Sequence, residues 1–133
     1  MAAGFSVVYL GQETDGSLIA PASRAALFAL KPTIGSVTMD NVIPVSSTFD
    51  TVGGMARSVR DLATLTEIVL DPPARAKIPE DGYLSYLTAN WEGLRLGFLD
   101  PEIWKLPDSL CEPNESALTQ MVRFLTIAPA AWR

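Results

Sequence analysis

The chain has no histidine, a single cysteine and no long hydrophobic run, and each of these absences excludes a class of function. Without histidine, the usual general base of serine and cysteine hydrolases is missing, so a serine nucleophile would need a lysine. Cys111 alone can form no internal disulfide, and without histidine it fits none of the common zinc sites. We therefore expect no bound metal and no cofactor.

Positive charge is also scarce. The sequence has 10 Lys and Arg against 15 Asp and Glu, a net charge of −5, and no basic cluster that could neutralise a run of phosphates. Nucleic acid is therefore not an expected partner. The first positively charged side chain is Arg24, so the N-terminus lacks the charged start of a secretory signal, and no apolar run approaches the ~18 residues that span a bilayer. We expect a cytoplasmic protein with no membrane partner; the sequence leaves its oligomeric state open.

The hydrophobic residues, 48% of the 133, are enough for one globular domain in which strands and helices alternate. The run Phe5–Leu10 predicts a buried strand that stops at Gly11. The alanine-rich run Ala22–Leu30 predicts a short helix, because it consists mainly of strong helix formers. Over Thr33–Val45, β-branched residues mixed with turn residues predict extended segments joined by turns.

Further along the chain, helical spacing of apolar residues predicts a helix over Ser58–Leu70. Its first serine can act as the N-cap, and Asp61 stands three residues on, as in a capping box. Residues 71–90 show no clear period and predict a surface excursion. A second strand over Leu94–Leu99 and a last helix beginning near Asn114 complete an α/β arrangement.

The stretch GQETDGSLIAPAS, residues 11–23, has the pattern of a catalytic bend. After the predicted strand, Thr14, Asp15, Gly16 and Ser17 can turn successive backbone N–H groups toward one point beside the serine hydroxyl. Acyl transfer needs such donors, because negative charge moves onto the carbonyl oxygen in the transition state. The same spacing also fits an ordinary Asp-Gly turn before a helix. A phosphate cradle is a weaker interpretation, because the bend lacks the Gly-Lys-Ser/Thr ending of a P-loop.

Two long segments, GQETDGSLIAPASRAALFALKPTIG and VIPVSSTFDTVGGMARSVRDLATL, resemble the amidase signature family. The nucleophile loop of that family reads Gly-Thr-(Asp/Glu)-Thr-Gly-Gly-Ser and continues through Pro-Ala to Leu-Lys-Pro-Thr. The resemblance is strong over residues 1–70 and weaker over 71–133. It implies that residues 1–133 form a partial amidase signature domain: an α/β fragment of that fold, with a partial mixed sheet and flanking helices.

By this resemblance the protein is an amide-bond hydrolase acting on a small-molecule carboxamide. Ser17 is then the catalytic nucleophile, and the backbone N–H groups of Thr14, Asp15 and Gly16 form the oxyanion hole. Family members activate this serine with a lysine relayed through a second serine on a cis peptide bond, and both lie upstream of the positions that match here. We therefore expect this chain alone to be inactive. The alternative is a non-catalytic amidase-like remnant that acts as a binding or interaction module.

Three positions depart from the family pattern. Asp15 stands where the family commonly has glycine, so its backbone angles must suit a residue with a Cβ. Ile19 replaces an arginine that many relatives carry. Gly54 replaces the usual proline before Met55, which we interpret as a harmless loop change.

The lysines and the second motif offer no replacement for the missing base. Lys31 belongs to the Leu-Lys-Pro-Thr segment, which the family carries in addition to its catalytic lysine, so we assign it a structural role. Lys77 and Lys105 lie in irregular stretches without a tie to the bend. Asp50 and Thr51 are interpreted as loop anchors.

Overall fold

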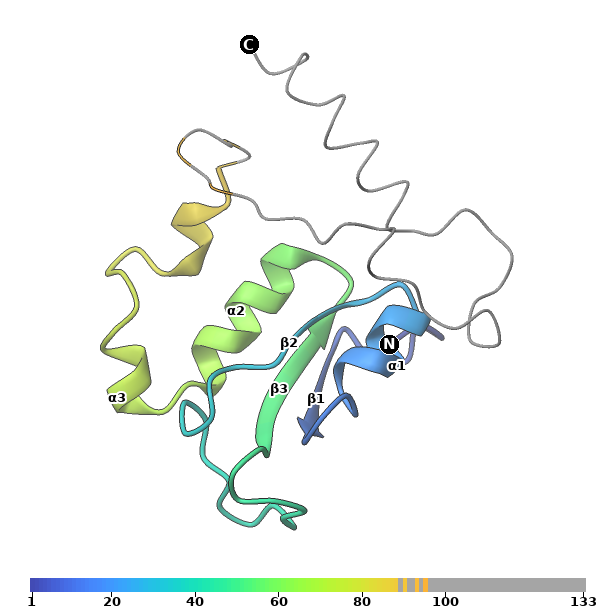
Figure 1. The fold of residues 1–133 in the computed structure, drawn as a ribbon. Coiled ribbons are helices and arrows are strands. Elements are labelled where there is room, and N and C mark those ends of the chain that lie inside the picture. Colours follow the sequence, from blue (N-terminus) through green and yellow to red (C-terminus); the bar gives the residue numbers. More distant parts are fainter. Residues whose placement is uncertain (89, 91–92, 94, 96–133) are drawn as a thin grey trace. The chain divides into compact units, whose positions relative to one another are not determined.

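The computed structural model describes residues 1–88, 90, 93 and 95, and the chain divides into two units, Met1–Asn90 and Trp91–Arg133. The helices and strands of the described residues all lie in the first unit (Figure 1). The predicted α/β fold class is confirmed. In chain order the elements are β1 (Val8–Glu13), α1 (Ile19–Arg24), β2 (Phe28–Leu30), β3 (Thr51–Ala56), α2 (Val59–Val69), α3 (Pro72–Arg75) and the 3₁₀ helix η1 (Tyr83–Tyr86).

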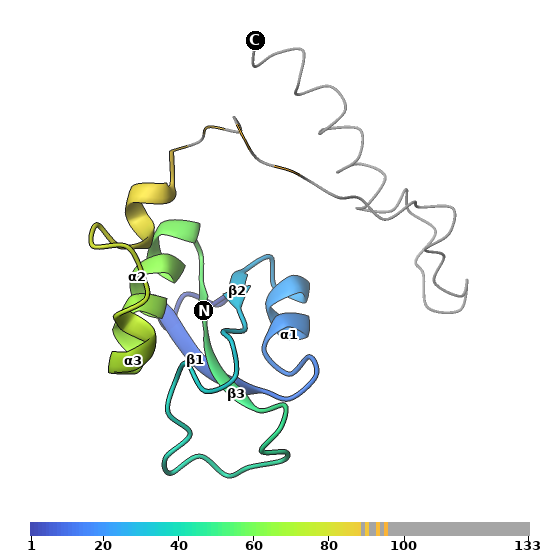
Figure 2. The same ribbon diagram turned by 60° about the vertical axis from the view of Figure 1, so that its left-hand side comes forward.

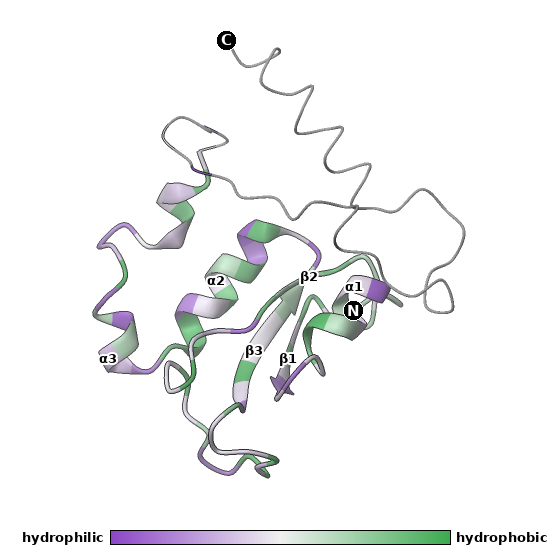
Figure 3. Cartoon of the chain, viewed as in Figure 1, coloured by the Kyte–Doolittle hydropathy of each residue, from purple (hydrophilic) through white to green (hydrophobic). Residues whose placement is uncertain are grey.

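The three strands form one antiparallel sheet in the order β1-β3-β2. β1 pairs with β3 along its whole length, with Gly11 opposite Gly53, and β2 pairs with the C-terminal half of β3, with Leu30 opposite Gly54. Within the described residues β1 and β2 are therefore the two edges of the sheet. The purple end of β1 in Figure 3 carries its hydrophilic residues, Gln12 and Glu13.

Glycines in the sheet permit unusually close packing, which explains why the predicted end of the first strand is wrong. A Cβ added at Gly11 would lie 2.9 Å from Cδ1 of Leu18. The glycine therefore allows the Leu18 side chain to pack closely against the strand, and the strand continues past it. The strand begins at Val8, three residues later than predicted from the run Phe5–Leu10, and continues to Glu13. This extension places Glu13 at the start of the bend.

Helices cover opposite faces of the sheet (Figure 2). On one face, Leu18, the residue before α1, and Ala22 within α1 pack against Met55 and form the buried core cluster. On the other face lies α2, whose Leu65 approaches so closely that a Cβ at Gly54 would lie 2.7 Å from its Cδ2. Because side chains alternate along a strand, Met55 and Gly54 point to opposite faces of β3. Met55 therefore contacts the side of the sheet covered by α1, and the adjacent Gly54 contacts the side covered by α2.

The predicted helix over Ser58–Leu70 is confirmed as α2, with the predicted cap. Ser58 has an extended backbone (φ −137°, ψ 153°), and its hydroxyl accepts the backbone N–H of Asp61 at 3.1 Å. The buried side chains of α2 are Leu62, Leu65 and Thr66, spaced as one helical stripe. Figure 3 shows hydrophobic and hydrophilic residues alternating around this helix.

The helix predicted over Ala22–Leu30 is wrong in its extent. The observed α1 ends at Arg24, and Phe28–Leu30 is strand β2. Ala26 takes a left-handed conformation (φ 52°), and the N–H of Leu27 bonds the carbonyl of Ala22 at 2.9 Å, which closes the helix as a Schellman motif does. Pairing with β3 therefore outweighs the helix propensity of the alanine-rich run.

The connections are turns and short helices. Within the predicted turn region Thr33–Val45, main-chain bonds close turns at residues 33–36 and 39–42, and Asn41 has a positive φ of 64°. The predicted surface excursion contains α3 and η1. The strand predicted over Leu94–Leu99 and the helix predicted near Asn114 lie outside the described residues. None of the helices in the described part of the chain is long and apolar enough to span a membrane.

Candidate active site

The candidate site is the loop of residues 14–18, which joins β1 to α1. Thr14 to Gly16 form a bend, and Ser17 lies in the turn directly before Leu18, the N-cap of α1. The side chain of Ser17 is exposed, and its hydroxyl has no hydrogen-bond partner among the described residues. The loop therefore presents an accessible serine at the start of a helix.

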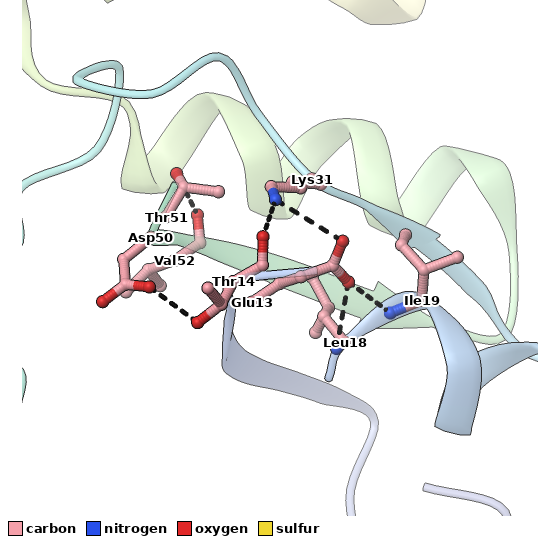
Figure 4. A network of polar contacts seen from close by, with 8 residues as sticks. All are labelled: Glu13, Thr14, Leu18, Ile19, Lys31, Asp50, Thr51 and Val52. Atoms are coloured by element: carbon pink, nitrogen blue, oxygen red, sulfur yellow. Dashed lines mark hydrogen bonds and ion pairs between the residues drawn. The ribbon is translucent and has the colours of Figure 1, made fainter. Parts of the chain in front are cut away.

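Glu13 holds the C-terminal end of this loop, where α1 begins. Its carboxylate is buried, and Oε2 accepts the backbone N–H of Leu18 at 3.0 Å and that of Ile19 at 2.7 Å (Figure 4). A carboxylate is a suitable acceptor there, because the first N–H groups of a helix lack partners within the helix. The last residue of β1 is thus tied to the first turn of α1, and the loop between them is closed.

Asp50, which lies just before β3 and is 3% exposed, holds the N-terminal end of the loop at Thr14. Oδ1 accepts the hydroxyl of Thr14 at 2.6 Å, and Oδ2 accepts the side-chain N–H of Gln12 at 3.0 Å. Oδ2 also accepts the backbone N–H groups of Val45 at 2.7 Å and Ser46 at 2.9 Å. Asp50 therefore joins the serine loop to the segment that leads into the central strand, as its interpretation as a loop anchor requires.

These bonds act on the acidity of Asp50. The Thr14 hydroxyl does most to lower the pKa of this carboxyl below its ordinary value of 3.8, and the two backbone amides and Gln12 add to it. Desolvation by burial works in the opposite direction and is outweighed. Asp50 is therefore ionised at neutral pH and accepts all four bonds as a carboxylate.

Lys31 reaches the loop from the residue after β2. Its Nζ donates to the backbone carbonyl of Thr14 at 2.5 Å and lies 3.8 Å from Oε1 of Glu13 (Figure 4). The contacts of this ammonium are thus with the loop backbone and the Glu13 carboxylate, which fits the structural role predicted for it. Lys77 is exposed near the end of α3, and Lys105 lies outside the described residues.

The residues predicted as oxyanion donors, Thr14, Asp15 and Gly16, lie on this one loop with Ser17. Asp15 has no positive φ, so its backbone accepts a side chain where the family pattern has glycine. A Cβ added at Gly16 would meet no atom within 4 Å in the described part of the chain. Open space therefore adjoins the backbone immediately before the serine.

Sequence reasoning missed how Glu13 and Lys31 hold the loop, and it misjudged Gly54. Gly54 is not in a loop: it is buried in the central strand between Leu10 and Leu30, where a larger residue would meet Leu65. The only available signal for Glu13 was an acid shortly before a helix start, which favours the helix dipole. Among the described residues, no group of three or more His, Cys, Asp and Glu is placed to hold a metal ion.

Comparison with known proteins gives one family. The family model described as Amidase matches residues 1–123. The chain is 38% identical over 101 residues to a glutamyl-tRNA(Gln) amidotransferase subunit of Carboxydothermus hydrogenoformans, covering 73% of this chain and 21% of that protein. It is 40% identical over 105 residues to the corresponding protein of Rubrobacter xylanophilus, covering 74% and 21%.

Solved structures give the same result. The native peptide amidase of Stenotrophomonas maltophilia matches with a TM-score of 0.51 and 40% identity, covering 59% of this chain and 17% of that one. An amidase family protein of Bacillus anthracis matches with a TM-score of 0.51 and 35% identity, covering 64% and 16%. The chain spans about a fifth of the length of the curated relatives it matches.

Proposed function

Because the chain belongs to the amidase family, we propose that it carries the nucleophile of an amide-bond hydrolase and that Ser17 is this nucleophile. Residues 1–133 are then a partial amidase domain. The observation that carries the proposal is the exposed Ser17 hydroxyl on a loop held at both ends by the buried carboxylates of Glu13 and Asp50. The substrate is a small-molecule carboxamide.

The reaction is acyl transfer in two steps. The Ser17 oxygen bonds to the carboxamide carbon and its hydroxyl proton is transferred to the leaving nitrogen, so the tetrahedral intermediate breaks the C–N bond and releases a neutral amine. Water then hydrolyses the acyl ester, releasing the carboxylate and restoring the serine. The N–H groups of Thr14, Asp15 and Gly16 stabilise the negative oxygen of the intermediate, and one such donor contributes about 2.7–4 kcal/mol in a well-studied case.

Within the described residues, no side chain is placed as a base for the proposed chemistry. The sequence contains no histidine, and within the described residues the Ser17 hydroxyl contacts no lysine. An unactivated serine hydroxyl is a weak nucleophile. We therefore predict that the purified chain releases no measurable ammonia or amine from carboxamides. Turnover that disappears in Ser17→Ala would contradict this prediction.

The nucleophile itself is tested with a fluorophosphonate probe. The serine oxygen bonds to phosphorus and fluoride leaves, so the step needs the same oxyanion donors but no leaving amine. Ser47 is the matched control, because it is exposed and its side chain has no partner among the described residues. We expect labelling at Ser17 to be about 100-fold faster than at Ser47, the lower end of the effect of one oxyanion donor. Equal labelling of the two serines, read by peptide mapping, would refute the assignment.

A further inference from the structure

Thr14 is held at two points by charged side chains. Its hydroxyl donates to Oδ1 of Asp50 at 2.6 Å, and its carbonyl accepts Nζ of Lys31 at 2.5 Å (Figure 4). The two bonds come from segments that approach from β3 and β2, which are paired in the sheet. The side chain and the carbonyl of Thr14 are therefore both tied to the rigid part of the fold.

Holding the Thr14 carbonyl also fixes the next amide. The carbonyl of Thr14 and the N–H of Asp15 belong to one planar peptide unit, in which they point in opposite directions. Once the oxygen is held by Lys31, the direction of the Asp15 N–H is set. This amide donates no hydrogen bond to any described residue, so it remains available to a ligand.

The ammonium that holds this peptide is itself positioned. Lys31 directly follows Leu30, whose register in the sheet is fixed opposite Gly54. Its Nζ lies 3.8 Å from the Glu13 carboxylate, and its side chain is only 29% exposed. A bond from a charged donor also polarises the peptide, because hydrogen bonds in a chain strengthen one another, and this makes the Asp15 N–H a better donor.

We propose that Lys31 is a positioning residue of the oxyanion hole: through the Thr14 carbonyl it orients and polarises the Asp15 amide. The inference rests on the proposed function in one respect, since the Asp15 amide meets an oxyanion only if Ser17 is the nucleophile. Lys31 acts here as a proton donor in a hydrogen bond to the backbone and removes no proton from Ser17.

The first test measures the amide itself, independently of reactivity, in a Ser17→Ala background. In Lys31→Met the ammonium is replaced by an apolar chain, so the ¹⁵N and ¹H shifts of the Asp15 amide should move. In Lys31→Arg, which keeps a charged donor, both chemical shifts should return most of the way to their values in the chain that carries Ser17→Ala alone. Lys77→Met, which removes an exposed lysine elsewhere, is the control and should leave the Asp15 amide unchanged.

The second test measures the consequence for Ser17. We expect fluorophosphonate labelling of Ser17 to fall about tenfold or more in Lys31→Met, part of the effect of one oxyanion donor, and to recover in Lys31→Arg. Thermal midpoints measured alongside separate this loss from simple unfolding. A drop in labelling that Arg fails to restore, or that follows the loss of stability alone, would overturn the proposal.

A measurement on the unmodified chain guards against a variant that does not fold. A scalar coupling across the hydrogen bond between Lys31 Nζ and the Thr14 carbonyl carbon reports the contact directly, and its absence would overturn the inference. Unchanged chemical shifts of the Asp15 amide in Lys31→Met would also overturn the inference, even if Ser17 labels rapidly. If the amide responds but Ser17 labels no faster than Ser47, the orientation stands and the proposed nucleophile fails.

Discussion

Replacing Gly53 by alanine tests how the sheet holds the serine loop. A Cβ at this position in the central strand would lie 2.2 Å from the carbonyl oxygen of Leu30 and 2.6 Å from Cδ2 of Leu18. The Leu18 side chain can rotate away, but the Leu30 oxygen can move only if β2 moves. Overpacking a core costs about 1–3 kcal/mol, and a clash with backbone belongs at the upper end. We therefore expect Gly53→Ala to lose about 3 kcal/mol of unfolding free energy.

The assay is thermal unfolding followed by circular dichroism. In a domain of about 60–100 residues, 1 kcal/mol shifts the midpoint by about 4–8 °C, so the expected decrease is about 12–24 °C. Gly16→Ala is the matched control, because its Cβ would meet nothing within 4 Å among the described residues and its φ is not positive. Its stability should stay within about 0.5 kcal/mol of the wild type.

Gly53→Ala should also change the position of Ser17, because Leu18 directly follows Ser17 and packs over Gly53. We expect slower fluorophosphonate labelling of Ser17 in Gly53→Ala even well below its midpoint. A Gly53→Ala chain that melts within about 4 °C of the wild type would refute the close approach of β2 and β3 on which this reasoning depends.

Two further predictions concern the elements around the loop. The pKa of Asp50 is lowered by its bond from Thr14, so its contribution to stability is present above pH 3.8 and is lost as the pH falls through a folded-state pKa below that value. Denaturant midpoints measured from neutral pH down to about pH 3 should show this acid loss, and Asp50→Asn should flatten it while exposed Asp40→Asn should not. Ser58→Ala removes the N-cap of α2 and should cost about 0.5–2 kcal/mol, against no measurable change in exposed Ser47→Ala; equal effects would contradict the cap.

The parts of the fold that the sequence predicts well are those specified locally. Helix α2 is predicted with its cap, because the cap and the apolar stripe are contiguous in sequence. The run that ends in Phe28–Leu30 is predicted as helix, because its alanines favour a helix. Its pairing with β3 depends on a strand more than 20 residues later and cannot be recognised from the local order of residues. The first strand is predicted to stop at Gly11, since a glycine needed for close packing looks like a turn glycine in sequence.

The same distinction applies to the candidate site. Thr14 to Ser17 are contiguous, so their pattern is visible as a bend and as a family motif. The bonds that hold them join residues 17, 36 and 38 positions apart in sequence, from Lys31 to Thr14 and from Thr14 and Gln12 to Asp50. Nothing in the spacing of a lysine and a threonine predicts that one donates to the carbonyl of the other. Only the paired strands bring them together.

The three charged residues divide the polar groups of the loop among themselves. Glu13 takes the amides of Leu18 and Ile19, and Lys31 and Asp50 take the carbonyl and hydroxyl of Thr14. Within the described residues this leaves the amides of Asp15, Gly16 and Ser17 unpaired, although most backbone N–H groups in proteins have a partner. The carboxylates of Glu13 and Asp50 accept bonds elsewhere, so neither competes for these amides. A run of such amides beside an exposed hydroxyl is the arrangement that the proposed oxyanion hole requires.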